Sequence, residues 1–129
     1  MALEVWTTGA GIPGLAERFA SAAEAAGYDG LALVDSQNLA GDCYVGLALA
    51  AKATTRLRLA TGVPTPETRP PAATAAAIAA VHAESGGRAV LGIGRGDSAL
   101  AHLGYAPVSP ASFERALRRA GVPMAYSQG

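Results

Sequence analysis

The sequence has one cysteine, no net charge and no long apolar run, and each shortage excludes a class of protein. The single Cys43 cannot form a disulfide within the chain. Ten acidic and ten basic residues cancel, so the chain lacks the basic surface that nucleic acid or an anionic membrane selects. Charges, glycines and prolines interrupt every alanine-rich segment before it reaches the roughly 18 residues of a membrane-spanning helix. We therefore expect no internal disulfide, no nucleic-acid partner and no membrane span.

The beginning and the length of the chain predict its compartment and its number of domains. The first residues form neither the basic segment nor the long apolar segment of a secretory signal peptide. Together with the single cysteine, this favours a cytoplasmic protein. The 129 residues, of which 50% are hydrophobic, suffice for one domain with a buried core. We therefore predict a single domain over residues 1–129.

Short apolar runs alternate with helical patterns along the chain. Four apolar runs are typical of buried strands: residues 3–6, 31–34, 57–62 and 89–93. Four segments have helical spacing: residues 15–26, about 42–53, 72–84 and 98–103. In the first helix one face is formed by apolar residues: Leu15, Phe19, Ala22, Ala23 and Ala26. The order βαβαβαβ predicts an α/β fold with a parallel sheet covered by helices.

The polar loops of this pattern are expected to meet on one side of the sheet. Right-handed crossovers place the C-terminal ends of all parallel strands at the same edge. Four loops would converge there: residues 7–11, 35–42, 62–69 and 94–97. Both α/β barrels and doubly wound sheets build their sites at this edge. We therefore predict that the functional site lies among these loops.

The most distinctive motif is Gly92-Ile93-Gly94-Arg95-Gly96-Asp97. Its glycines allow a tight turn close to a ligand, while Arg95 and exposed backbone amides favour an anion. This is the chemistry of a phosphate-bearing cofactor. Strand ends are also glycine-rich merely to make a turn, so the motif alone leaves both interpretations open. A Rossmann-like nucleotide domain is a weaker alternative, because no Gly-x-Gly-x-x-Gly follows the first strand.

Several motifs in a fixed order resemble the luciferase-like monooxygenase superfamily. The segments that carry the resemblance are Gly27-Tyr28-Asp29-Gly30, Val34-Asp35, residues 59–63, Thr68-Arg69-Pro70, Gly87-Arg88, residues 91–97 and Leu103-Gly104. They span residues 1 to about 115 and are together more specific than the glycine motif. The chain looks most like the N-terminal half of the branch related to methylene-tetrahydromethanopterin reductase, which uses the deazaflavin coenzyme F420.

The resemblance implies a fold, a cofactor and a set of site residues. Family members resemble a TIM barrel and bind FMN or coenzyme F420 at the C-terminal ends of the strands. Asp35 and Asn38 would then lie beside the cofactor ring, and a non-prolyl cis peptide at Gly62-Val63 would lie behind it. Arg95 falls where flavin-binding relatives place a phosphate-contacting arginine. The loop around that arginine would be shaped by Gly94, Gly96 and Asp97.

One departure from the family bears on the type of reaction. Many relatives have a histidine immediately after the position that matches Asp35, whereas this chain has Ser36. An imidazole general base is therefore missing, which favours simple hydride transfer over monooxygenation. We expect a flavin- or F420-dependent oxidoreductase that transfers a hydride to a small organic substrate. We assign no catalytic residue and no metal site.

A second departure is the length of the chain. A complete (β/α)8 barrel takes about 250 residues, so the resemblance implies a truncated relative with half of the barrel and a divergent tail over about residues 116–129. Four parallel strands without closure leave two open edges, and we therefore expect a homo-oligomer. The alternative function is a non-enzymatic half-barrel, either an inactive fragment or a dimerising structural module.

For several residues two interpretations stay open. Asp35 is either a ring contact or an ordinary turn former, and Arg95 is either a phosphate ligand or a surface residue. Arg69 either closes over a ligand or solvates the start of a helix. Cys43 has the position of a low-pKa thiol, but it is more simply a buried structural residue. The remaining titratable candidates, read as surface or capping residues rather than catalysts, are His82 and His102.

Overall fold

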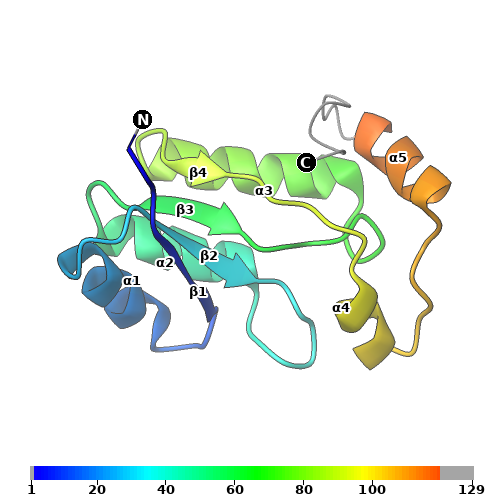
Figure 1. The fold of residues 1–129 in the computed structure, drawn as a ribbon, viewed down its shortest axis with the longest axis horizontal. Helices are drawn as coiled ribbons and strands as arrows, with labels where there is room; N and C mark the ends of the chain where they lie inside the picture. The colour runs from blue at the N-terminus through cyan, green and yellow to red at the C-terminus, as the bar shows by residue number, and fades with distance from the viewer. Residues whose placement is uncertain (1, 120–129) are drawn as a thin grey trace.

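The structure, a computed structural model, describes residues 2–119 and contains one parallel sheet with its helices (Figure 1). Its elements are β1 (Trp6–Ala10), α1 (Ala16–Ala25), β2 (Gly30–Val34), α2 (Cys43–Ala53), β3 (Arg58–Thr61), α3 (Pro71–Glu84), β4 (Ala89–Val90), α4 (Asp97–His102) and α5 (Pro110–Arg119). The strands pair in the order β1-β2-β3-β4, and every pair is parallel. The predicted α/β class and the order βαβαβαβ are confirmed.

The order of the strands decides which kind of α/β fold this is. Each strand lies beside its predecessor in the chain, so successive right-handed crossovers place their helices on the same face of the sheet. The strands pack against α1, α2 and α3. A doubly wound sheet has helices on both faces, whereas a barrel has them only outside. The described residues therefore form one part of a barrel wall.

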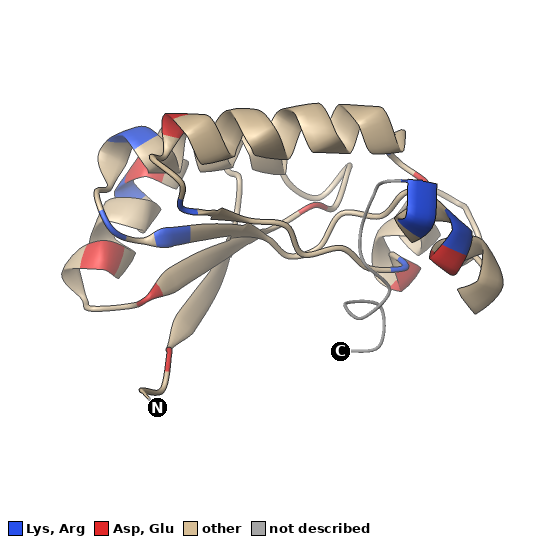
Figure 2. Ribbon diagram, turned by 90° about the horizontal axis from the view of Figure 1, so that it is seen from above, with Lys and Arg blue, Asp and Glu red and all other residues tan. Residues whose placement is uncertain are grey.

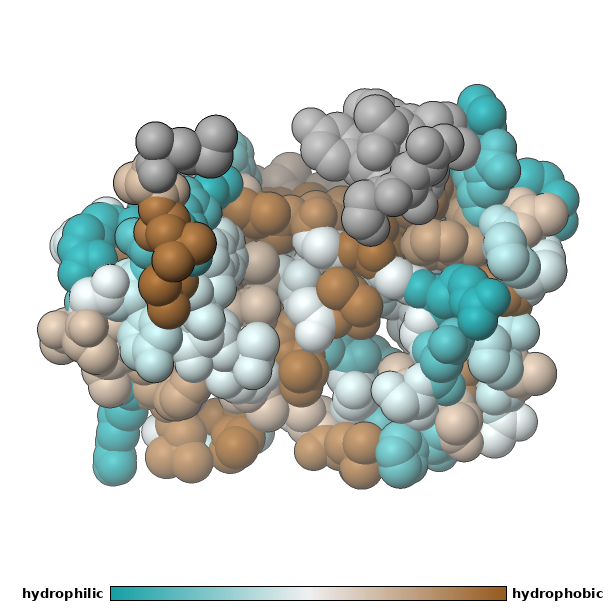
Figure 3. All heavy atoms as spheres, viewed as in Figure 1, coloured by the Kyte–Doolittle hydropathy of each residue, from teal (hydrophilic) through white to brown (hydrophobic). Residues whose placement is uncertain are grey.

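The core lies between the sheet and its three helices. Leu31, Leu33 and Leu59 alternate along β2 and β3 and are fully buried against the helices. The intervening residues, such as Ala32, point to the opposite face, because side chains alternate along a strand. Thr8, the register partner of Ala32, is exposed there. Figure 3 shows apolar and near-neutral residues across the middle of this open face.

The helix α1 buries a different face from the one that its apolar residues suggest. Ala16, Ala20 and Ala23 are its buried residues, whereas Leu15 and Phe19 are 46% and 40% exposed. The small side chains allow α1 to pack closely, since helices at short axial distances have no room for leucine or phenylalanine. Of the predicted apolar face only Ala23 is buried. Hydrophobicity alone therefore does not identify the buried face of α1.

The predicted bounds of the first strand and of the loop after it are wrong. The apolar run 3–6 lies almost wholly before β1, and residues 7–10 of the predicted loop belong to the strand. The backbone pairs with β2 from Trp6 opposite Gly30 to Ala10 opposite Val34. A Cβ at Gly30 would overlap the Trp6 ring, so this glycine permits the pairing. Pairing with a neighbouring strand can thus bring polar threonines into a strand, although they lie outside the apolar run from which the strand was predicted.

The last strand and the last helices also differ from the pattern. β4 covers only Ala89–Val90, and residues 91–96 continue as an irregular segment. α5 was not predicted. The helix α3 carries no Asp, Glu, Lys or Arg except Glu84 at its end (Figure 2), where Glu84 pairs with Lys52 of α2 at 2.6 Å. Of the predicted divergent tail at about residues 116–129, residues 116–119 belong to α5 and residues 120–129 lie outside the described residues.

The carboxylate of Glu24 links α1 to the turn before β3. It accepts hydrogen bonds from the backbone N–H groups of Thr55 (3.1 Å), Arg56 (2.8 Å) and Leu57 (2.8 Å). Partial burial alone would raise the pKa of Glu24, but these hydrogen bonds outweigh it and hold the pKa below its usual 4.5. The ionised form therefore stabilises the fold.

This shift predicts a pH-dependent contribution to stability. Because the folded pKa is depressed, the stabilisation by Glu24 is fully present above pH 4.5 and is lost as the pH falls through the folded pKa. At pH 7, Glu24→Gln is expected to lower the free energy of unfolding by about 1 kcal/mol, since a partly exposed carboxylate is screened by solvent. Urea unfolding at pH 7 and pH 3 tests this. A difference between wild type and variant that is equally large at both pH values would contradict the prediction.

Candidate active site

The loops that follow β2, β3 and β4 enclose a pocket of about 330 Å³ at the C-terminal ends of the strands. Its lining residues are Val34, Asp35, Ser36, Gly62, Val63, Arg95, Gly96, Asp97, Ser98 and Ala99. We call this the first pocket. Its volume lies at the lower end of the range of small-molecule sites, about 300–1,000 Å³. It occupies the edge of the sheet at which the sequence predicts the site.

The structure brings most of the predicted site residues together in the first pocket. Those that line it are Asp35, Gly62, Val63, Arg95, Gly96 and Asp97. Gly94 lies beside it, where a Cβ would approach Val63 Cγ2 to 2.7 Å. Asn38 does not line the first pocket and belongs to a second one. The separation arises because residues 36–42 form a long loop that leads away from the end of β2.

An apolar surface lies at the end of β3. The Gly62–Val63 peptide bond is cis, as the resemblance implies. Gly62 donates its N–H to the Leu33 carbonyl at 2.7 Å, and Gly94 donates to the Pro64 carbonyl at 3.0 Å. Val63 is 43% exposed. Backbone contacts to both neighbouring segments thus hold an exposed valine in the pocket.

Arg95 brings a cation to the lining of the first pocket. Arg95 Nη2 pairs with Asp97 Oδ1 at 3.2 Å, and the Arg95 side chain is 38% exposed. Thr65 Oγ1 donates to the Arg95 carbonyl at 3.1 Å. Gly96 has φ +81°, and a Cβ there would meet Thr65 at 2.7 Å, so only glycine fits. The loop therefore presents the guanidinium to the pocket in a defined position.

A second pocket of about 360 Å³ adjoins the first, and Asp35 lines both. The other residues that line the second pocket are Gln37, Asn38, Ala40, Gly41, Asp42, Thr68 and Arg69. Asp35 is 2% exposed. It follows the last residue of β2, so the strand fixes its position. The two pockets thus share one buried residue, Asp35.

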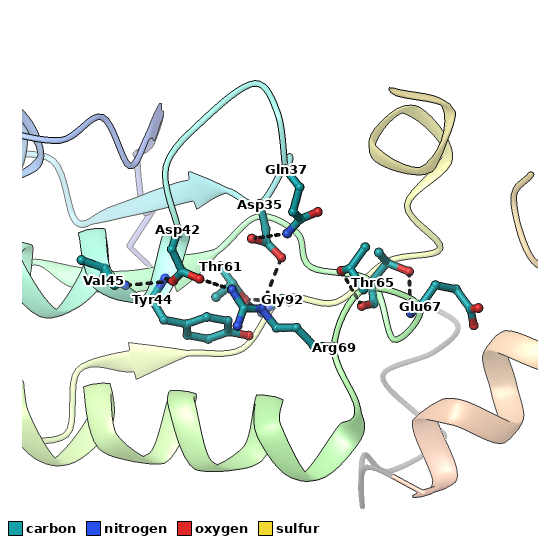
Figure 4. Close-up of polar contacts among 11 residues, drawn as sticks. Asp35, Gln37, Asp42, Tyr44, Val45, Thr61, Thr65, Glu67, Arg69 and Gly92 are labelled. Atoms are coloured by element: carbon teal, nitrogen blue, oxygen red, sulfur yellow. Dashed lines mark hydrogen bonds and ion pairs between the residues drawn. The ribbon is translucent and has the colours of Figure 1, made fainter. Parts of the chain in front are cut away.

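Asp35 contacts Gln37 of its own loop and Arg69 of the loop after β3 (Figure 4). Gln37 Nε2 donates to Asp35 Oδ1 at 3.0 Å, and Arg69 Nε lies 3.8 Å from Asp35 Oδ2. Arg69 Nη2 also hydrogen-bonds Asp42 Oδ2. Asp42 in turn accepts the N–H groups of Tyr44 (2.9 Å) and Val45 (3.1 Å) as the N-cap of α2. The cap of a helix and the site carboxylate therefore share one arginine.

The charges of Asp42 and Arg69 follow from the contact between their side chains. Burial alone would raise the pKa of Asp42, but the hydrogen bond from Arg69 and the capped backbone N–H groups outweigh it, so the net shift is downward. Burial alone would lower the pKa of Arg69, but Asp42 and Asp35 together raise it. Burial raises the pKa of Tyr44 to about 12. Asp42 and Arg69 thus carry opposite charges at neutral pH, and the Tyr44 hydroxyl keeps its proton.

The positions of the cysteine and of the two histidines bear on the interpretations that the sequence left open. Cys43 is fully buried, and burial, followed by the nearby Asp35 carboxylate, raises its pKa above its usual range. The reactive-thiol alternative is therefore wrong, because a buried thiol next to a carboxylate resists ionisation. His82 and His102 are exposed in the last turns of α3 and α4. Neither histidine lines the two pockets.

The sequence missed the partners of the predicted residues. Ser36 and Ser98 line the first pocket, and Arg69 pairs with Asp42 across 27 residues of sequence. For Arg69 the sequence leaves open closure over a ligand or solvation of a helix start, and no local signal identifies Asp42 as its partner. Within residues 2–119, no group of three or more His, Cys, Asp and Glu side chains could hold a metal ion. No helix in that range is long and apolar enough to cross a membrane.

The family model described as luciferase-like monooxygenase matches residues 5–120. The chain belongs to this family. The match includes every described strand and helix, among them α5. It reaches only the first residues of the predicted divergent tail at 116–129, which stays a prediction.

Curated relatives share a name and match part of the chain. The 5,10-methylenetetrahydromethanopterin reductase of Methanolobus tindarius is 41% identical over 81 residues, or 63% of this chain and 24% of that protein. The reductase of the same name from Archaeoglobus fulgidus is also 41% identical over 81 residues, with the same shares of 63% and 24%. The chain thus spans about a quarter of the length of these relatives.

Solved structures share the fold. The coenzyme F420-dependent tetrahydromethanopterin reductase of Methanopyrus kandleri has a TM-score of 0.71 and 26% identity, over 95% of this chain and 31% of that one. The oxygenating constituent of 3,6-diketocamphane monooxygenase from Pseudomonas putida, in complex with FMN, has a TM-score of 0.73 and 20% identity. It covers 93% of this chain and 38% of that chain. The fold is that of a luciferase-like barrel, of which this chain matches a part.

Proposed function

We propose that the first pocket binds coenzyme F420 or FMN and that the chain takes part in hydride transfer between this cofactor and a small organic substrate. Family membership supports an oxidoreductase. The names of the relatives support the cofactor, since one is described as F420-dependent and another is in complex with FMN. The chain spans about a quarter of the reductases' length. Hydride transfer by this chain is therefore a proposal as well.

One observation carries the proposal. The loops after β2, β3 and β4 form one pocket, and its lining includes both an apolar surface and a cation. Val63 after β3 supplies exposed apolar surface, and Arg95 after β4 supplies a guanidinium. A flavin or deazaflavin joins a flat ring to a phosphate, and such a molecule needs both features. The apolar surface of Val63 and the guanidinium of Arg95 therefore fit a flavin or deazaflavin cofactor. When bound, the cofactor supplies the two-electron chemistry.

The residues of the first pocket have distinct roles in this proposal. Arg95 binds the phosphate by turning from Asp97, which at present neutralises its charge. Val63 excludes water beneath the ring. Ser36 and Ser98 offer hydroxyl groups that orient polar atoms of the ligand. The roles assigned to these residues are to bind and orient the cofactor.

Self-association stays a prediction. β1 and β4 are the two edges of the sheet, and β1 has free ladder positions on one side within the described residues. Exposed edges and an open apolar face favour pairing with another chain. The mass of the purified chain in solution, measured by light scattering, would test this.

The test of the proposed function is titration of the purified chain with FMN and with coenzyme F420, followed by fluorescence. Saturable binding of one molecule per first pocket is the expected result. Failure of a folded chain to bind either cofactor would contradict the proposal and favour the non-enzymatic module. The stoichiometry per assembled unit would separate a site within one chain from a site shared by two.

Arg95→Ala is expected to weaken cofactor binding by about tenfold to a hundredfold, because it removes a charge-assisted contact to phosphate. His82→Ala is the matched control, since His82 is exposed on α3 and lies outside both pockets. Fluorescence titration of both variants measures the two dissociation constants. Equal effects of the two substitutions would contradict the assignment of the first pocket.

A further inference from the structure

Asp35 belongs to the lining of the first pocket, yet its carboxylate is buried. The Asp35 side chain is 2% exposed, and its Oδ2 atom is buried and accepts no hydrogen bond from the described residues. An ionised carboxylate in water accepts several hydrogen bonds, so its burial is costly unless donors or a cation replace the water. Neighbouring groups must therefore hold this carboxylate away from the solvent in the pocket.

Gln37 and Arg69 are these neighbouring groups. Gln37 Nε2 donates to Asp35 Oδ1 at 3.0 Å. Arg69 Nε lies 3.8 Å from Asp35 Oδ2, so the guanidinium attracts the second oxygen by its charge, although the distance is too long for a hydrogen bond. In Figure 4 the carboxylate points toward this arginine. The two oxygens of Asp35 are thus held from different directions.

Arg69 has a fixed position of its own. Its Nη2 atom hydrogen-bonds Asp42 Oδ2, and its guanidinium lies 4.6 Å from the centroid of the Tyr44 ring. Asp42 and Tyr44 belong to the N-cap and the first turn of α2. Because an ion pair and a cation–π contact hold the guanidinium from two sides, its positive charge stays beside Asp35.

A carboxylate without this restraint would turn toward water, and the first pocket is an accessible space next to Asp35. There it would repel the phosphate of a cofactor and compete with that phosphate for Arg95. We propose that Arg69 is a positioning residue that holds the Asp35 carboxylate out of the first pocket. The effect on cofactor binding rests on the proposed function, whereas the restraint itself is a property of the chain without a ligand.

The first test measures how fast carboxyl groups of the full 129-residue chain react with a carbodiimide and an amine, with each residue followed by mass spectrometry. Asp97 is the internal reference, because its side chain is 62% exposed. Asp35 is expected to react at least about tenfold more slowly than Asp97. Arg69→Met should raise the rate at Asp35 at least about tenfold and leave the rate at Asp97 unchanged. An unchanged rate at Asp35, or equal rates at both residues in the wild type, would overturn the proposal.

Two variants and a buried thiol separate this restraint from general support of the fold. Arg69→Lys keeps the positive charge, and Asp42→Asn removes the other partner of Arg69 but keeps an N-cap oxygen. Both should leave the rate at Asp35 within about threefold of the wild type. Alkylation of the fully buried Cys43 reports opening of the start of α2. If Cys43 in Arg69→Met becomes as reactive as Asp35, Arg69 only supports the fold, and the proposal is wrong. If Arg69→Met does not fold, Arg69→Gln, which also lacks the charge, takes its place.

Fluorescence titration with FMN connects the restraint to the first pocket. Arg69→Met is expected to weaken FMN binding by about tenfold, because the released carboxylate repels the phosphate. In an Asp35→Asn background the same substitution should change the dissociation constant by less than about threefold, since no carboxylate is left to restrain. A tenfold loss that persists in this background would mean that Arg69 acts on the cofactor without Asp35, which contradicts the proposal.

The outcomes separate this inference from the proposed function. A chain in which Arg69 protects Asp35 from labelling but which binds neither FMN nor coenzyme F420 supports the restraint and refutes the cofactor site. A chain that binds FMN equally well with and without Arg69 supports the cofactor site and refutes the inference. Arg118→Met is the matched control for the loss of an arginine, because Arg118 forms an exposed ion pair with Glu114 on α5 and should change neither the labelling nor the binding.

Discussion

Arg88→Met is expected to lower the free energy of unfolding by about 3 kcal/mol or more, which corresponds to a fall of about 10 °C in Tm. Methionine keeps an unbranched apolar stem, although a shorter one, and removes every charged donor. Arg88 lies immediately before β4, at the N-terminal edge of the sheet, and most of the carbonyl groups that it binds lie more than 30 residues away in the chain. The effect therefore comes chiefly from contacts between elements.

The physical reason is a set of backbone carbonyl groups that one guanidinium satisfies. Arg88 Nη2 donates to the Ala51 and Thr54 carbonyls at 3.0 Å, and Nη1 donates to the Leu57 carbonyl at 2.7 Å. Arg88 Nε donates to the Ser85 carbonyl at 2.7 Å. The end of α2, the start of β3 and the end of α3 are thus joined. Without the arginine these part-buried carbonyl groups lose their partners, which costs more than a neutral hydrogen bond contributes.

Urea unfolding followed by circular dichroism measures the effect. Arg118→Met is the control, because Arg118 makes an exposed ion pair with Glu114 one helical turn away and should change stability by less than about 0.5 kcal/mol. Arg88→Lys should recover only part of the loss, since an ammonium group cannot reach carbonyls in several directions. Equal stability of Arg88→Met and Arg118→Met would show that the network contributes nothing.

Gly92→Ala is expected to lower the free energy of unfolding by about 2 to 3 kcal/mol. A Cβ at Gly92 would overlap the carbonyl oxygen of Thr61 in the neighbouring strand. The two residues also exchange hydrogen bonds, since Gly92 N–H donates to Thr61 Oγ1 at 3.0 Å and Thr61 Oγ1 donates to the Gly92 carbonyl at 2.7 Å. A methyl group would separate the segments and break both contacts.

A second glycine separates this clash from simple backbone strain. Gly104 has φ +79°, and a Cβ there would meet no atom within 4 Å. Gly104→Ala should therefore cost only the conformational term, about 1 kcal/mol. Urea unfolding of both variants compares the two costs. A loss from Gly92→Ala no larger than that from Gly104→Ala would mean that β3 and the segment after β4 separate without cost.

The fold could be predicted from local signals wherever the hydrophobic spacing, the helix caps and the turn residues indicate the same element. The helical spacing and the cap at Asp42 predicted α2, and the structure shows the cap with its backbone contacts. Gly27 ends α1 with φ +89°, as a terminating glycine should. The strand order was predictable because each apolar run is followed by one helix, and right-handed crossovers leave few arrangements. The edge that carries the pockets followed from the same rule.

The predictions failed where contacts between elements override local composition. Polar Thr7 and Thr8 join β1 through pairing with β2, while the apolar Leu3 and Val5 before the strand stay exposed. Phe19 lies outside the core because close packing of α1 selects alanine. Both errors have one cause: hydrophobicity describes a side chain, and burial depends on which neighbour lies opposite.

The sequence by itself determined the parallel α/β order, the edge that carries the two pockets and, through its motifs, six of the residues that line the first pocket. Only the tertiary structure decided the partners of the charged residues. Arg88 stood in a recognised motif without a role until α2, β3 and α3 met around it. Arg69 likewise acquired Asp42 as a partner, and Asp35 acquired a place between two pockets. Periodicity and turn residues act within a few positions of the chain, whereas ion pairs and pockets depend on segments that meet only after folding.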